Sequence, residues 1–328
     1  MSGSVLAFVE HAGAEPDRLS LEALALARGL ATKLGVPLDA VVLGSAAEGA
    51  AAQLGAHGVG LAHVASDPRL DDFAPAAWGA AIRAVVAVRS PSAVVVAGSE
   101  RSNEVLAHVA ARLGLPMAAN VIEVAPGDAW RLVRQRWAGS LLEEAALDAP
   151  IRLVSVAPHA VAAAPMASTP APTIASFEPE LEPADLVARV VGREAKTLAG
   201  VSLADAKVVV GGGRGVGSAA GFANLEALAN ELGGAVGGSR VVTSLGWRPH
   251  ADQIGQTGLR IAPDLYIACG ISGAIQHIVG CKAAKRILAI NTDPDSPIMA
   301  VADYAVIGDL SAIVPAITAE IERRRASA

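Results

Sequence analysis

The sequence predicts an α/β protein of two domains, each a mainly parallel sheet flanked by helices, the C-terminal one doubly wound. Three observations predict this class. Strand and helix signals alternate along both halves. The 328 residues are 52% hydrophobic, enough to bury two cores. A fresh strand–glycine loop–helix series starts near residue 206. We therefore place the domains at 1–196 and 197–328.

The N-terminal half alternates strands with helices in chain order. Strands are expected at 4–10, 38–44, 59–65, 93–98 and 117–124, and helices at 17–35, 51–58, 73–89 and 101–114. Asp17 and Ser20 are candidate caps for the first helix, which Gly35 and Pro37 would end. Further strand patterns at 130–137 and 151–157 indicate a more antiparallel region.

The segment 158–183 is rich in proline and alanine, which is typical of a stiff, extended chain. This segment could itself be the linker between the two domains, as an alternative to the boundary at 196/197. We favour a later boundary because residues 185–196 still alternate like a strand that returns to the first sheet. In the second half, strands are expected at 206–213, 263–270, 286–292 and 303–309, and helices at 218–234, 278–285 and about 310–325.

Composition argues against several classes of function. The net charge of −6 gives no reason to expect nucleic acid as a partner, and no apolar run reaches the ~20 residues that membrane insertion needs. The start of the chain lacks the pattern of a signal peptide, so we expect a cytoplasmic protein. Cys269 and Cys281 form no CxxC pair, and we expect two packed thiols rather than a metal or redox site.

The two halves differ in the glycine content of their first strand-to-helix turn. The turn "EHAGAEPDR" has no glycine cradle, and His11 in it is expected to be a solvated loop residue, so the N-terminal domain is predicted to be a scaffold or interface. The turn "GGGRGVGS" at 211–218 has the position of an anion site. It matches neither G-x-G-x-x-G, because of Val216, nor the P-loop, so a tight turn that needs glycines is the alternative.

Polar residues recur where successive strands of the second half end. They are Arg214, Ser239, Arg240, Gln256, Thr257, Ser272, His277, Asn291 and Asp309. Ligands of open α/β sheets bind at the carboxyl ends of strands, so together these residues predict a ligand crevice. Taken singly, Asp309 could be a helix cap, Asn291 a turn former and Arg240 a surface charge.

Six stretches carry a resemblance to a known family. They are "GGRGVGS", "GGSR", "IGQTG", "YIACGISGAIQH", "AINTDPDSPI" and "VADYAVIGDL". In this order they resemble the alpha subunit of electron-transfer flavoproteins, strongly from about residue 206 and more faintly over 4–196. One departure is "VVTSLGW" at 241–247, where the family commonly has a short valine run and Asp-Ala-Gly.

The resemblance implies an electron carrier, not an enzyme with bond chemistry of its own. Its partners would be an electron-transfer flavoprotein beta subunit in a heterodimer, flavin dehydrogenases as donors, and an acceptor such as a membrane quinone oxidoreductase. The alpha subunit would hold FAD in its C-terminal domain. The beta subunit would hold AMP or, in the bifurcating type, a second FAD. Readings left open are that bifurcating type and an NAD(P)-binding oxidoreductase domain.

The resemblance also implies a role for each site residue. Arg214 and Ser239 would contact the nucleotide side of FAD, and Arg240 would lie against the isoalloxazine. Thr257 would lie near flavin N5, and His277 would reach the pyrimidine carbonyl. The full set is Arg214, Ser239, Arg240, Ile254, Gly255, Gln256, Thr257, Ser272, Gly273, Ala274, Ile275, Gln276 and His277, with Asn291, Asp309 and Leu310 at the adenosine end.

His277 is predicted to act on the charge of the flavin. Reduction places negative charge along the N1–C2=O edge, and an imidazole N–H beside a helix start would favour that form. The ring is expected about one turn inside its helix. The alternative is a core histidine that is hydrogen-bonded to a neighbouring strand.

Overall fold

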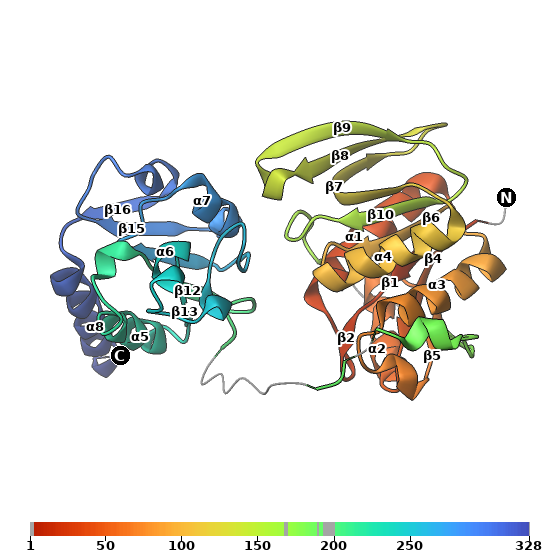
Figure 1. The fold of residues 1–328 in the computed structure, drawn as a ribbon, viewed down its shortest axis with the longest axis horizontal. Helices are drawn as coiled ribbons and strands as arrows, with labels where there is room; N and C mark the ends of the chain where they lie inside the picture. The colour runs from red at the N-terminus through yellow and green to blue at the C-terminus, as the bar shows by residue number, and fades with distance from the viewer. Residues whose placement is uncertain (1–2, 167–169, 189, 193–200, 328) are drawn as a thin grey trace. The chain divides into compact units, whose positions relative to one another are not determined.

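The computed structural model describes residues 3–166, 170–188, 190–192 and 201–327. The chain divides into two compact units, Met1–Glu194 and Ala195–Ala328. Each unit is a mainly parallel sheet flanked by helices (Figure 1), so the predicted fold class is confirmed. The expected boundary at 196/197 lies outside the described residues.

The first unit is built on a nine-stranded sheet in the order β11-β5-β4-β1-β6-β10-β7-β8-β9. Pairing is parallel from β11 to β7 and antiparallel between β7, β8 and β9. The strands are β1 (Val5–Phe8), β4 (Leu38–Leu43), β5 (Leu61–Ala65), β6 (Ala93–Ala97), β7 (Met117–Ala125), β8 (Trp130–Arg136), β9 (Leu141–Leu147), β10 (Arg152–Val156) and β11 (Thr173–Ser176). A separate two-stranded ribbon pairs β2 (His11–Ala12) with β3 (Glu15–Pro16).

Helices cover both faces of this sheet. They are α1 (Arg18–Leu34), α2 (Ala47–Ala52), α3 (Pro75–Arg89) and α4 (Glu100–Leu113), with 3₁₀ turns η1 (Leu54–His57), η2 (Pro68–Leu70), η3 (Trp137–Gly139) and η4 (Pro183–Leu186). Residues of α1 and α2 pack into one apolar core and residues of α3 and α4 into another. Asp17 caps α1 by accepting from the backbone N–H of Leu19, and Gly35 ends the helix with a left-handed φ of 66°, as predicted.

The expectation of a more antiparallel region at 130–137 and 151–157 is wrong in part. Strand β10 is parallel to both β6 and β7, although β8 is antiparallel as expected. Strand β9 was not foreseen, because "LLEEAAL" carries no strand alternation of its own. Its seven-residue register with β8, together with the ion pair between Arg134 and Glu143, holds it in the sheet.

The expected strand at 185–196 is also wrong in its described part. Residues 183–186 form η4 instead, and 189 and 193–196 lie outside the described residues. Asp185 explains the turn, because its carboxylate accepts from the backbone N–H of Glu182 and pairs with Arg112 on α4. Arg112 lowers the pKa of Asp185 against the effect of burial. The strand that returns to the sheet is β11, inside the proline- and alanine-rich segment.

A carboxylate of the chain itself sits at the switch point of the first sheet, where β1 lies between β4 and β6. Glu10 follows β1, and its Oε1 accepts hydrogen bonds from the hydroxyls of Ser99 and Ser102 at the start of α4. Ser99 also caps α4. His11 is held too, because its ring nitrogens lie 2.7 and 2.8 Å from the carbonyl oxygens of Gly13 and Leu43. Backbone carbonyls thus hold the His11 ring in place, although the residue remains partly exposed.

The second unit has a five-stranded sheet that is parallel throughout, in the order β13-β12-β14-β15-β16. Its strands are β12 (Val208–Gly212), β13 (Ala235–Gly238), β14 (Leu265–Cys269), β15 (Ile287–Asn291) and β16 (Tyr304–Ile307). Its helices are α5 (Phe222–Glu231), α6 (Arg240–Ser244), α7 (Ile275–Cys281) and α8 (Leu310–Ala326), with 3₁₀ turns η5 (Arg214–Val216), η6 (His250–Asp252) and η7 (Pro297–Val301).

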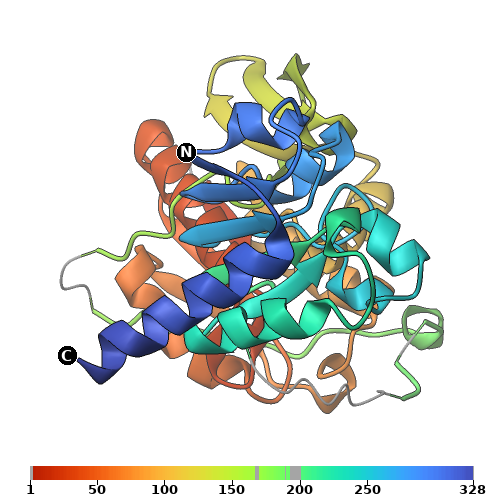
Figure 2. The ribbon, with the colours of Figure 1, turned by 90° about the vertical axis from the view of Figure 1, so that its left-hand side faces the viewer.

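Helices α5 and α8 lie side by side (Figure 2) and bury one face of the second sheet. The other face is covered by α7, by loop residues such as Ile254 and Ile261, and by Ile298 of η7. Strand β12 lies between β13 and β14, so the order reverses there. The carboxyl ends of these three strands are therefore the expected position of a crevice.

Candidate functional site

A cavity of about 730 Å³ opens at the carboxyl ends of β12, β13 and β14, a size usual for small-molecule sites. The turns after these strands and the loop at 253–257 line it. Twelve of the sixteen predicted site residues are among the lining residues: Arg214, Ser239, Arg240, Ile254, Gly255, Gln256, Thr257, Ser272, Gly273, Ala274, Gln276 and His277. The cavity lies at the strand ends where the sequence predicted a ligand crevice.

The other four predicted residues do not line the cavity. Ile275 is exposed on α7, and Leu310 is buried at the start of α8. Asp309 caps α8 by accepting from the backbone N–H of Ser311, at 2.8 Å. The Asn291 side chain donates to the carbonyl of Ile271, at 3.0 Å. The structure thus gives these two residues the cap and turn contacts weighed as alternatives.

Two glycine turns meet at the base of the site. The backbone N–H of Gly213, after β12, donates to the carbonyl of Cys269, and that of Gly215 donates to Gly270, after β14. A Cβ placed on Gly213 would lie 2.2 Å from the Gly270 oxygen. No larger residue fits without moving the turn, so the glycines serve close packing of the two strand ends. Arg214 is exposed just beyond this contact.

The charge of the lining is positive. It includes Arg214 and Arg240 and no carboxylate. Arg240 is the exposed first residue of α6, and the preceding Ser239 makes no capping hydrogen bond to that helix. The arrangement suits a ligand that carries negative charge and hydrogen-bond acceptors.

A buried amide orients one hydroxyl of the lining. The side chain of Gln253 is 3% exposed, and its Nε2 donates to Oγ1 of Thr257 at 2.9 Å. Its Oε1 accepts from Oγ1 of Thr243 at 2.7 Å. Because Thr257 accepts from the amide, its own proton is free for a ligand. Gln253 and Thr243 were not predicted as site residues. Gln253 lies in the loop after η6 and Thr243 on α6, and only the fold brings them together.

His277 is the third residue of α7, nearer the helix start than expected, and α7 ends at Cys281 rather than 285. Its ring is 6% exposed, and Nε2 lies 2.7 Å from the Tyr266 hydroxyl on β14. Burial lowers the pKa of His277 to about 4, and the nearby backbone of Ile254 offsets this in part. Nδ1 makes no well-aligned hydrogen bond within the described residues. The histidine therefore lines the cavity as a neutral ring that is also bonded to a strand.

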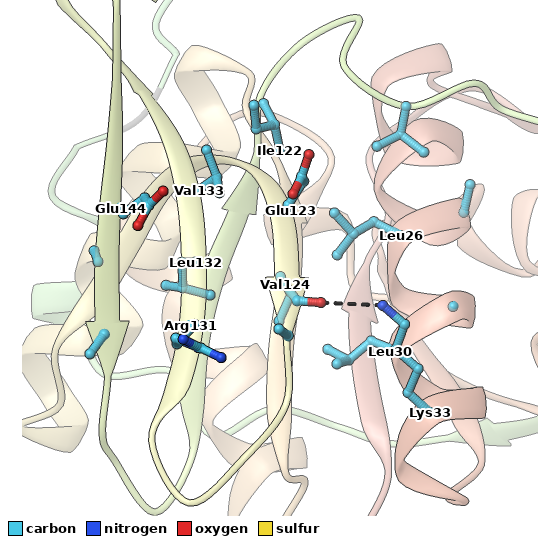
Figure 3. Close-up of a pocket in the computed structure, with 16 residues that line it drawn as sticks. Leu26, Leu30, Lys33, Ile122, Glu123, Val124, Arg131, Leu132, Val133 and Glu144 are labelled. Atoms are coloured by element: carbon cyan, nitrogen blue, oxygen red, sulfur yellow. Dashed lines mark hydrogen bonds between the residues drawn. The ribbon is translucent and has the colours of Figure 1, made fainter.

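A second concavity, which the sequence did not indicate, lies in the first unit. A groove of about 840 Å³ separates α1 from strands β7, β8 and β9. Figure 3 shows Leu26 and Leu30 of α1 facing Val124 and Leu132, with Lys33 donating to the Val124 carbonyl at 3.3 Å. Most of its labelled side chains are aliphatic.

Other kinds of site are not present in the described part of the chain. It holds no cluster of three or more potential metal ligands among His, Cys, Asp and Glu. None of its helices combines the length and apolarity needed to cross a bilayer. Cys269 and Cys281 are free, buried thiols, and burial raises the pKa of each to about 12. This agrees with the packed thiols that the sequence predicted.

Comparison with known proteins gives the same family for both units. Residues 5–181 match the electron transfer flavoprotein domain, and residues 202–282 match the electron transfer flavoprotein FAD-binding domain. The chain is 36% identical over 325 residues to the electron transfer flavoprotein subunit alpha of Mycobacterium tuberculosis, covering 98% of this chain and 99% of that protein. It is 33% identical over 324 residues to that of Bacillus subtilis, covering 98% of each.

A third relative, the protein FixB of Clostridium saccharobutylicum, is 35% identical over 322 residues and is covered over 95% of its length. These relatives therefore align with both units of the chain. The family predicted from six short stretches is thus confirmed over most of the chain, including the half where the resemblance was faint. The chain belongs to the electron transfer flavoprotein family, as a member of its alpha-subunit branch.

Proposed function

We propose that this chain binds FAD in the cavity at the ends of β12, β13 and β14 and carries electrons as the alpha subunit of a heterodimer. The observation that carries the proposal is the convergence of twelve predicted flavin contacts on one cavity with two arginines and no carboxylate. The FAD-binding domain match covers the residues that line it.

The residues present fit a flavin by their chemistry. The buried Nδ1 of His277 lacks a well-aligned partner, and the hydroxyl proton of Thr257 is free. A flavin ring offers acceptors to both, and its phosphates suit Arg214. When bound, FAD supplies the one- and two-electron chemistry, and the protein binds it, orients it and tunes its potential.

Each polar group then has a defined task. Arg240 brings a permanent positive charge to the ring side, and His277 brings a neutral donor, because its low pKa keeps it uncharged at pH 7. Both favour negative charge on the ring. The chain itself makes or breaks no substrate bond, so it acts as a carrier between flavin dehydrogenases and an acceptor such as a membrane quinone oxidoreductase.

The N-terminal unit would supply the surface for the beta subunit. Its β8–β9 hairpin leaves Trp137 74% and Leu142 66% exposed, and Leu141 beside them is exposed as well. Exposed apolar side chains that gather at one tip are typical of a protein–protein contact. The beta subunit would carry AMP, or a second FAD in a bifurcating complex.

Co-expression with an electron transfer flavoprotein beta subunit tests the proposal. We expect a yellow heterodimer whose flavin is released as FAD, with one FAD assigned to the alpha chain by loss of binding in Arg214→Ala. Two flavins per heterodimer would indicate the bifurcating type. A colourless complex that binds NAD(P)H instead would overturn the proposal in favour of an oxidoreductase domain.

A further inference from the structure

Two buried rings lie together beneath the cavity. The hydroxyl of Tyr266 on β14 is 2.7 Å from Nε2 of His277, and the ring centroids are 6.0 Å apart. Tyr266 is completely buried and does not line the cavity, whereas His277 does. Tyr266 therefore acts on a ligand only through His277.

The direction of this hydrogen bond follows from counting protons. Burial raises the pKa of Tyr266 well above its usual value and lowers that of His277 to about 4, so both groups are neutral at pH 7. Each then has one proton to place. Within the described residues, the Tyr266 hydroxyl has His277 as its hydrogen-bond partner and no other.

If Nε2 carried the imidazole proton, it would donate to the phenol oxygen. The proton of the phenol would then be buried without an acceptor, which costs about 1–3 kcal/mol. If the phenol donates instead, its proton is used and Nε2 accepts. The remaining imidazole proton then lies on Nδ1, which has no well-aligned hydrogen-bond partner within the described residues.

The packing of the sheet fixes the position of the Tyr266 side chain. Strand β14 pairs with β12, and Gly211 on β12 leaves the space that the phenol fills. A Cβ on Gly211 would lie 2.3 Å from the Tyr266 oxygen. The phenol is thus held on a central strand in a close-packed interior, so the orientation of the bond is set before any ligand enters.

We propose that Tyr266 is a positioning residue, which donates to Nε2 of His277 and so fixes the tautomer whose Nδ1–H is offered to the ligand. Electrostatic stabilisation by a donor requires that the proton face the charge, and a neutral histidine has only one to offer. The inference depends on the proposed function only for the identity of the ligand as a flavin.

The first test is the tautomer itself, measured by ¹⁵N–¹H correlation of histidine side chains in the complex with the beta subunit. His277→Asn identifies the resonance among the seven histidines. We expect Nδ1 protonated and Nε2 unprotonated between pH 6 and 8, and a mixture of tautomers in Tyr266→Phe. The matched control is Tyr304→Phe, the other tyrosine, which is exposed on β16 and should leave the spectrum unchanged.

A proton on Nε2 in the unaltered protein, or the same single tautomer in Tyr266→Phe, would overturn the proposal. This measurement needs no flavin, so it is independent of whether FAD is the ligand. In the flavin-loaded complex, Tyr266→Phe should lower the midpoint potential by less than His277→Ala does. It should add nothing when combined with His277→Ala, whereas additive shifts would contradict an action through His277.

Discussion

The side-chain amide of Gln253 donates to the hydroxyl of Thr257 across 2.9 Å, inside the wall of the cavity. Gln253 is held in turn by Thr243, whose hydroxyl lies 2.7 Å from its carbonyl oxygen. The order of these three groups makes Thr257 a donor toward the cavity. Thr243, a residue of the "VVTSLGW" stretch, is thereby linked to the predicted flavin site through the buried amide of Gln253.

Replacing this amide should weaken FAD binding. Gln253→Met keeps the length of the side chain but removes the donor, so the Thr257 proton is no longer directed at the ligand. A hydrogen bond contributes about 0.5–1.5 kcal/mol, which corresponds to a rise in the FAD dissociation constant of about 2- to 12-fold. Fluorescence on flavin release measures it. Gln135→Met, on β8 of the other unit, is the control, and equal dissociation constants would refute the relay.

The two donors near the ring should set the first reduction potential. A hydrogen bond to a charged group contributes about 1.5–3 kcal/mol, and about 1.4 kcal/mol corresponds to about 59 mV for one electron. His277→Ala should therefore lower the potential by at most about 60–130 mV, and Arg240→Ala should act in the same direction. Potentiometric titration followed by absorbance checks both.

The control for these two variants is Arg286→Ala, which removes an exposed arginine paired with Asp303 away from the cavity. FAD should remain bound in all three proteins, because the predicted nucleotide contacts are intact. Retained FAD with unchanged potentials in both His277→Ala and Arg240→Ala would show that neither group faces the charge of the flavin.

Stability should fall in mild acid because His277 is buried and neutral. Its pKa is about 4 in the folded chain against 6.5 in the unfolded one, so between these values the unfolded chain binds the extra proton. The contribution is fully present above pH 6.5. At about 1.36 kcal/mol for each pH unit, about 3 kcal/mol is lost as the pH falls toward 4.

Urea unfolding of the flavin-free chain at pH 7, 6 and 5 tests this dependence. His277→Asn should flatten the slope of stability against pH, whatever its absolute stability. His250→Asn removes an exposed histidine of the same unit and should keep the slope. If His277→Asn keeps the slope as well, His277 is not the group that makes stability depend on pH.

The carboxylate of Glu10 should stabilise the first unit. Glu10→Ala leaves the hydroxyls of Ser99 and Ser102 without their acceptor at the start of α4, and we expect a loss of about 1–3 kcal/mol in unfolding free energy. Glu10→Gln retains an acceptor and should lose less. Glu104→Ala, on the exposed face of α4, serves as control. If Glu10→Ala and Glu104→Ala unfold at the same temperature, the contact between Glu10 and the two serines contributes nothing to stability.

Charge placed on the exposed hairpin tip should weaken the proposed heterodimer. Leu141→Glu with Leu142→Glu puts two carboxylates on β9 where we expect the beta subunit, and burial of an unpaired charge is costly. Retention of the beta subunit on an affinity-tagged alpha chain measures the effect. Val88→Glu, on the exposed side of α3, should retain it fully. Equal retention in both proteins would remove the tip from the interface.

The sequence predicted the repeating units of the fold because their signals are local. Alternation, the Asp17 cap and the Gly35 stop define α1 within a residue at each end. What it missed depends on pairing between distant segments. Strand β9 exists through its register with β8, and β11 lies in a segment whose composition indicated an extended linker but which pairs with β5.

The features of the candidate site also divide into those that the sequence could predict and those that it could not. Loops that follow strands could be found from the sequence, since carboxyl ends of parallel strands share one edge. The direction of a side chain could not. Asn291 and Asp309 have the right position along the chain, yet neither lines the cavity, because Asn291 donates to the backbone of Ile271 and Asp309 accepts from that of Ser311. Tyr266 and Gln253 act from the interior, where only packing shows which polar atoms meet.

The carboxylate of Glu10 at the switch point of the first sheet also implies that the two units differ in how their stability depends on ligand supply. A ligand that binds only the folded form stabilises it in proportion to the logarithm of its concentration. FAD would bind at the switch point of the second sheet, whereas Glu10 lies at the switch point of the first. The supply of flavin would then affect the stability of the second unit only. In cells depleted of riboflavin, the C-terminal half would then be the first to reach the proteases, while the N-terminal half stays folded.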